Sequence, residues 1–152
     1  MKIERFEDLI DWTRHTHGRL STCLSRAAGK HEQLRAQWLL TYLADHEKAL
    51  ARTIGRMEQH AKPHVLRTCI YDYLIREPIL FSGPSAKAYD SMSVDDISRE
   101  VFDIHNQVIE LYRSLARRAE IEGARVLADD LLKLEEHETM RLATQVGRIN
   151  EI

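Results

Sequence analysis

The placement of proline most strongly limits how this chain can fold. Its 152 residues contain three prolines, and all of them lie between Pro63 and Pro84. Proline interrupts helices because it has no backbone N–H and its ring clashes with the preceding turn. The long stretches on either side of this segment are therefore free to form uninterrupted helices. The sequence is divided into two helical halves around one irregular middle.

The first half has the apolar spacing of two long helices. One helix is expected from about Arg5 to Ala28, with Gly29 as its end, and a second from about His31 to His60. The short link between them predicts an antiparallel hairpin. The expected buried stripes are Phe6, Ile10, Thr13, His17, Leu20, Leu24 and Ala27 on the first helix, and Leu39, Leu43, His46, Leu50, Thr53 and Met57 on the second.

The second half predicts another helical hairpin. Ser93 to Asp96 has the pattern of a capping box, so a third helix is expected to begin there, and a fourth near Gly123. A short helix is expected within residues 64–76 of the connecting segment, which is long enough to join opposite ends of a bundle. The sequence therefore predicts one domain, residues 1–152, that is all-α: an antiparallel four-helix bundle of two helical hairpins joined by a long crossover.

The composition excludes several classes of protein. Lysine and arginine total 22 against 24 acidic residues, so the net charge of −2 predicts neither a nucleic-acid partner nor an anionic membrane. No apolar run approaches the roughly 20 residues of a membrane span. Cys23 and Cys69 have no metal-binding or disulfide spacing. Together with a charged N-terminus, these features predict a cytoplasmic protein with reduced thiols.

Polar side chains interrupt the apolar stripes near the middle of every helix. They are His17 on the first helix, His46 and the adjacent Glu47 on the second, His105 on the third, and Glu135 and Glu138 on the fourth. Because mid-helix residues of an antiparallel bundle lie at about the same height, these six side chains are expected to form one layer. Imidazole and carboxylate groups suit iron, manganese or zinc. The layer is thus a candidate transition-metal site.

The same residues also have plain structural interpretations. A histidine on a buried helical face commonly serves as a hydrogen-bonded core residue, and Glu138 can pair with Arg141 or Arg14. Trp12, Trp38, Tyr42 and Phe102 are assigned to helix packing. No Gly-rich phosphate loop, GxSxG turn or HExxH motif is present, which removes the commoner enzyme signatures.

The sequence resembles the ferritin-like superfamily, particularly its small rubrerythrin-type members. Residues 108–116 (VIELYRSLA) look like the third helix of that family, and residues 131–138 (LLKLEEHE) like its fourth. The resemblance implies a bundle that holds metal, with iron first and manganese or zinc as alternatives. The family's di-metal site takes one Glu from each of two helices and a Glu-x-x-His pair from each of the other two.

This chain departs from that pattern. His105 stands at the third-helix Glu position and His17 at that of the first helix, Leu43 replaces the Glu that precedes His46, and Glu138 replaces the fourth-helix His. A single ion or an altered pair is therefore expected. Two hypotheses follow: a ferritin-like metal-binding protein with oxygen- or peroxide-linked chemistry, and a catalytically silent bundle, with no bound metal, that dimerises or binds a partner. A homo-oligomer is compatible with both.

Overall fold

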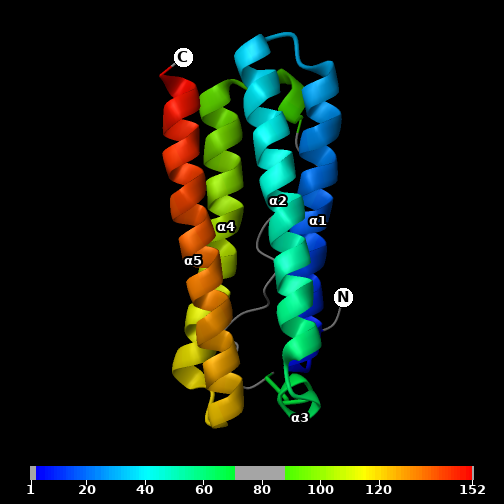
Figure 1. Ribbon diagram of the computed structural model, residues 1–152, viewed down its shortest axis with the longest axis vertical. Coiled ribbons are helices and arrows are strands. Elements are labelled where there is room, and N and C mark those ends of the chain that lie inside the picture. Colours follow the sequence, from blue (N-terminus) through cyan, green and yellow to red (C-terminus); the bar gives the residue numbers. More distant parts are fainter. Residues whose placement is uncertain (1–2, 71–87, 152) are drawn as a thin grey trace.

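The computed structural model describes residues 3–70 and 88–151, which form four long helices lying side by side (Figure 1). The long helices are α1 (Phe6–Lys30), α2 (Leu34–His60), α4 (Val94–Arg118) and α5 (Glu122–Asn150), and the short elements are α3 (Pro63–Leu66) and the 3-10 turn η3 (Tyr89–Ser91). Within the described ranges, the remaining regular pairing is one isolated bridge between Arg5 and Cys69. The predicted all-α class is confirmed.

The helices form two antiparallel pairs, α1 with α2 and α4 with α5 (Figure 1). The element α3 lies at the lower end of the bundle in that view, whereas Tyr89 of η3 packs with the upper core. The two hairpins are therefore connected between opposite ends of the bundle, as the sequence predicts. Residues 71–87 of the predicted connecting segment lie outside the described residues. No helix in the described part of the chain has both the length and the apolar character needed to cross a bilayer.

Two predicted helix boundaries are wrong. Gly29 does not end the first helix, because α1 continues to Lys30 and is closed by the backbone N–H of His31, which donates to Ala27. The His31 ring then accepts from the N–H of Gln33 and donates through Nε2 to the carbonyl of Met92, 2.8 Å away. This histidine therefore holds the turn between α1 and α2 against the segment that precedes α4.

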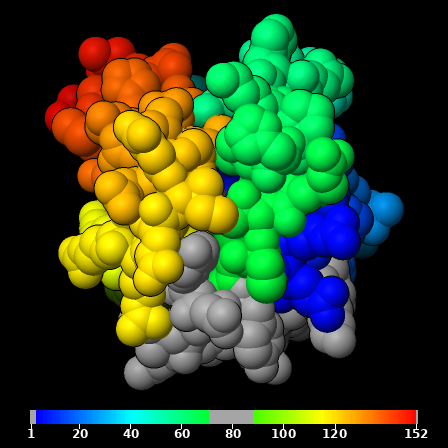
Figure 2. Space-filling model, turned by 90° about the horizontal axis from the view of Figure 1, so that it is seen from below, coloured from blue at the N-terminus to red at the C-terminus, as the bar shows by residue number. Residues whose placement is uncertain are grey.

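Of the short helix expected within residues 64–76, the described part is helical only to Leu66, where α3 ends, and residues 71–76 lie outside the described residues. The chain beyond it pairs with the N-terminus instead: the N–H of Phe6 donates to Thr68, and that of Ile70 donates to Glu4. This pairing places Ile70 in the core rather than on a helix. At the same end, a Cβ on Gly123 would come within 2.8 Å of Val65, so α3 and the start of α5 meet closely (Figure 2).

The second hairpin begins where the sequence predicts. Ser93 caps α4, and its hydroxyl accepts from the N–H of Asp96 at 3.1 Å. An N-cap of this kind stabilises a helix by about 1 kcal/mol relative to alanine. The other end of α4 is held by Arg125 of α5, whose guanidinium donates twice to the carbonyl of Ala119. Both ends of α4 are thus fixed by side chains.

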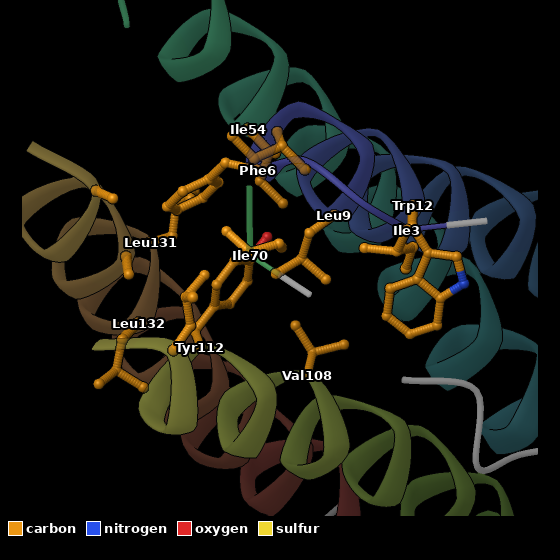
Figure 3. Packing of buried hydrophobic residues seen from close by; sticks show 14 of the residues in the cluster. Ile3, Phe6, Leu9, Trp12, Ile54, Ile70, Val108, Tyr112, Leu131 and Leu132 are labelled. Carbon is orange, nitrogen blue, oxygen red and sulfur yellow. The ribbon is translucent and has the colours of Figure 1, made fainter. Parts of the chain in front are cut away.

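The core consists of two hydrophobic clusters, one toward each end of the bundle. Figure 3 shows the lower cluster, in which Phe6, Leu9, Tyr112 and Leu131 converge from three helices. The upper cluster gathers Leu20, Leu24, Leu39, Leu43, Ile97, Val101 and Leu142. On all four long helices, the buried residues between these two sets are polar. The four polar interruptions therefore lie in one layer between two apolar halves.

The predicted stripe of the first helix is buried in full, whereas that of the second helix is shifted. Thr53 and Met57 are only half-buried, and Ile54 lies in the core instead. The sequence predicts that Trp38 packs between helices, but in the structure it is 46 % exposed. Its position one residue before the buried Leu39 turns the indole toward the outer edge of α2.

Candidate metal centre

The polar layer is built from one fully buried side chain on each long helix. His17 comes from α1, Glu47 from α2, His105 from α4 and Glu135 from α5. Ligand atoms of His17, Glu47 and His105 all lie within 4.8 Å of one another. Two imidazoles and a carboxylate, contributed by both hairpins, therefore converge on one point in the centre of the bundle.

His17 lies between two carboxylates. Its Nδ1 is 2.6 Å from Oε2 of Glu47, and its Nε2 is 2.8 Å from Oε1 of Glu135. Because both carboxylates are acceptors, both ring nitrogens donate, and the ring carries a positive charge. Burial lowers the pKa of His17, but the charges of Glu135 and Glu47 and their hydrogen bonds outweigh burial and raise the pKa from 6.5 to about 10.

Glu47 is the hub of the layer. One of its oxygens accepts from His17 and the other from Nε2 of His105. Burial raises the pKa of this carboxyl, but the charges of His105 and His17, with their hydrogen bonds, hold it well below its usual range. Nδ1 of His105 lies 3.0 Å from the hydroxyl of Thr139 on α5, which donates to it when Nε2 carries the ring proton. Thr139 therefore fixes the orientation of His105.

The layer also contains buried polar atoms that make no hydrogen bond to any described residue. Oε2 of Glu135 is one, because this carboxylate contacts His17 only through Oε1. Nε2 of His46 is the other, at 3.7 Å from Oε2 of Glu138, which is too long for a hydrogen bond. An unsatisfied buried acceptor typically costs about 1–3 kcal/mol. These two atoms have unused capacity to bind a ligand.

His46 and Glu138 lie on the outer side of the layer, between α2 and α5. Burial lowers the pKa of His46. The charges of Glu47 and Glu138 raise it and those of His105 and His17 lower it, and the net result is a lowered pKa. His46 is therefore neutral near pH 7. Glu138 is held by Arg141, whose guanidinium is 3.1 Å from Oε1. The structural interpretation of Glu138 as the partner of Arg141 is thus correct.

A second polar contact lies toward the lower cluster. The hydroxyls of Thr13 and Tyr112 are 2.5 Å apart, and Thr13 also donates to a backbone carbonyl of its own helix. Burial raises the pKa of Tyr112 above its usual range, and the nearby charge of Glu135 raises it further. Tyr112 therefore stays protonated and places a neutral hydroxyl beside the charged layer.

The structure changes the ranking of the six sequence candidates. Glu47, expected at the edge of its helix face, is fully buried at the centre, whereas His46, expected in the stripe, lies at the outer side. Glu135 contacts His17 on the nitrogen opposite Glu47 and stands outside the close group of three. Sequence reasoning missed Thr139, although its position four residues after Glu135 puts both on one helix face.

Searches for similar proteins give no independent guide to this site. No protein-family model, no curated protein and no solved structure matches the chain. Its interpretation therefore rests on the contacts and charges described above.

Proposed function

We propose that this protein binds a transition-metal ion in the buried group formed by His17, Glu47 and His105, within a ferritin-like bundle. The observation that carries the proposal is the convergence of three ligand atoms within 4.8 Å of one another. Three atoms so arranged lie within about 2.8 Å of a common centre, against about 2.0–2.2 Å for bonds from nitrogen or oxygen to zinc. Small side-chain movements suffice to close this difference.

The charge of the layer fits a divalent cation. His17 carries one positive charge between the carboxylates Glu47 and Glu135, which leaves the three groups with a net negative charge. If His17 gives up a proton when a divalent ion binds, two carboxylates balance two positive charges. Imidazole with carboxylate is also a donor set that iron, manganese and zinc accept. Charge and donor chemistry therefore both support such an ion.

The buried atoms without hydrogen bonds support the same proposal. Oε2 of Glu135 and Nε2 of His46 are an acceptor and a neutral imidazole nitrogen with no partner among the described residues. They are candidates for additional ligands, with Glu138 beside His46 at the outer side of the layer. This arrangement is compatible with one ion at the centre, or with an altered pair.

Two contacts would hold the imidazoles in place around an ion. Nε2 of His17 donates to Glu135, and Nδ1 of His105 faces Thr139, so each ring has one nitrogen fixed and the other turned toward Glu47. Such partners orient histidine ligands and strengthen metal binding. The resemblance to rubrerythrin-type proteins adds the proposal that a bound iron or manganese ion supplies oxygen- or peroxide-linked chemistry.

A silent bundle is the second candidate function. It is favoured by the hydrogen bonds through which His17 joins both carboxylates without any ion. In that case the layer fixes the register of the two hairpins, which is an attested role for buried polar groups. A bundle of this kind would act by dimerising or by binding a partner.

Metal content separates the two candidates. Purified protein is expected to carry a transition metal in about a 1:1 or 2:1 ratio, and chelated protein to bind Co²⁺ or Zn²⁺ with a rise in melting temperature. His105→Gln is expected to abolish this binding, whereas His137→Gln, an exposed histidine on α5, leaves it unchanged. Elemental analysis without metal, and no thermal shift on adding iron, manganese or zinc, would favour the silent bundle.

A further inference from the structure

The exposed face of the α1–α2 hairpin contains a long groove that the buried layer does not explain. The groove encloses about 1200 Å³ and runs along α1 from Asp11 to Arg26 and along α2 from Ala44 to Gln59. Most of its lining residues are exposed or half-buried, Ser21 and Ala44 are buried, and none belongs to the polar layer. The groove is therefore separate from the candidate metal centre.

The groove is strongly basic. Its lining contains six cationic side chains, Arg14, Arg19, Arg26, Lys48, Arg52 and Arg56, against only two acidic ones, Asp11 and Asp45. Since the chain as a whole has more acidic than basic residues, this positive charge is a local feature. Lys48, Arg52 and Arg56 follow one another at four-residue intervals and thus form a row along one edge.

The floor of the groove is made of small residues. Gly18 lies in the middle of α1, and Gly55 lies in the last third of α2 beneath the side chain of Arg14. Inside a helix, glycine is less stable than alanine by about 1 kcal/mol. A Cβ on Gly18 would meet nothing within 4 Å, so packing inside the bundle does not require glycine there. The absence of a side chain instead allows another backbone to approach α1 closely.

An exposed tryptophan stands beside the groove. Trp38 lines a smaller hollow of about 350 Å³ that shares Ser25, Ala44 and Asp45 with the groove. Its indole is 46 % exposed. Tryptophan and arginine are the residues most enriched among those that dominate protein–protein binding energy. A basic groove with an adjacent tryptophan therefore fits a protein ligand better than a bare polyanion.

We propose that this groove is a docking site for an acidic helix of a partner protein. Small side chains of the helix would lie on the floor at Gly18, and an apolar side chain would contact Trp38. Glutamates at four-residue intervals would match the row of Lys48, Arg52 and Arg56, whose ends lie about 12 Å apart along the helix axis. A second copy docked by the same face would bring six cations against six, which charge repulsion opposes.

A designed peptide tests the proposal directly. The probe is a labelled helix of about 20 residues with alanines on one face and glutamates at four-residue intervals on its flanks. Fluorescence anisotropy is expected to give a Kd of about 1–100 µM, weakened at least tenfold by 0.5 M salt because the contacts are between exposed charges. The same peptide with lysine in place of glutamate is expected not to bind.

Two pairs of variants separate a helix-binding groove from general attraction of anions. The double change Lys48→Glu and Arg52→Glu is expected to weaken binding at least tenfold, and Arg117→Glu with Arg118→Glu, on exposed α4 positions, less than twofold. Gly18→Leu, which fills the floor, is expected to weaken it at least tenfold. Gly147→Leu is the matched control, since a Cβ there also meets nothing within 4 Å.

Three results would overturn the proposal. One is the absence of binding at 500 µM peptide. Another is full binding by the Gly18→Leu protein, or equal affinity for polyphosphate of the same charge, because either would mean that only charge matters. The third is sedimentation showing a wild-type dimer that Gly18→Leu dissociates, since the occupant would then be a second copy. Retained helical circular dichroism and melting temperature would show that each variant is folded.

Discussion

Replacing Glu47 by glutamine removes the central charge of the polar layer while keeping the shape of the side chain. In the wild-type protein this buried carboxylate accepts from Nδ1 of His17 at 2.6 Å and from Nε2 of His105. Glutamine offers one oxygen in place of two and turns an N–H₂ group toward a donor. The change therefore leaves the charge on His17 with a single carboxylate partner, Glu135.

The expected loss of stability is large. Breaking a buried ion pair by removing one partner costs about 3–5 kcal/mol. A loss of this size is expected here because the buried charge of His17 keeps only Glu135 of its two carboxylate partners. For a chain of this size, each kcal/mol lowers the melting temperature by about 2–4 °C, so a fall of about 6–20 °C is expected. The measurement is urea denaturation and thermal melting of chelated protein at pH 7. Glu120→Gln, at an exposed position, is the control and should change stability by less than about 0.5 kcal/mol.

A loss below about 1 kcal/mol for Glu47→Gln would refute the reasoning. It would mean that water reaches the layer and screens its charges, or that the side chains rearrange around glutamine without cost. Urea data would distinguish these cases, since a changed m-value reports a change in exposed surface.

Three further predictions concern the same layer. Chelated protein should be most stable between about pH 4.5 and 6.5. The raised pKa of His17 means that its contribution to stability is complete below pH 6.5 and is lost as the pH rises toward about 10. The lowered pKa of Glu47 means that its contribution to stability is lost as the pH falls below 4.5. The unfolding free energy should therefore fall by up to about 1.4 kcal/mol per pH unit between pH 7 and 9, and a flat profile would contradict it. Binding of Zn²⁺ at pH 7.5 should release about one proton from His17. Calorimetry in buffers of different ionisation enthalpy measures this release. The His17→Gln protein, which lacks this imidazole, should not release that proton. Tyr112→Phe should destabilise the protein by about 0.5–1.5 kcal/mol, because it removes one buried hydrogen bond while Thr13 keeps its bonds to backbone carbonyls. Equal stability by urea denaturation would show that this contact is not important.

The sequence predicts the layer because burial and periodicity are local properties. His17 lies between Thr13 and Leu20, and His105 between Val101 and Val108, so each position follows from spacing along its own helix. The common height of these residues follows from the antiparallel connection of long helices. The proline cluster then predicts how the two hairpins are joined. The height of the layer and the connection of the hairpins can therefore be predicted without knowing which side chains contact one another.

The exchanged roles of His46 and Glu47 show where sequence reasoning ends. Both residues border the apolar stripe, and a rotation of α2 by one residue, about 100°, decides which one faces the centre. In the structure Glu47 faces the centre; it is four residues from Leu43 and three from Leu50. His46 is three residues from Leu43 and four from Leu50, so it fits the stripe by spacing as well as Glu47 does. The partners of Glu47 on α1 and α4 compensate for its burial, and no local pattern reveals them.

The origin of the buried side chains also bears on how fast the site exchanges with solvent. His17 and Glu47 belong to the first hairpin, His105 and Glu135 to the second, and all four are fully buried. Neither hairpin holds the site alone, so we expect a proton or a bound ion at the centre to leave when the two hairpins move apart. The residence time would then depend on the frequency of that opening. We expect slow, kinetically trapped exchange that accelerates in step with hydrogen exchange of the core amides.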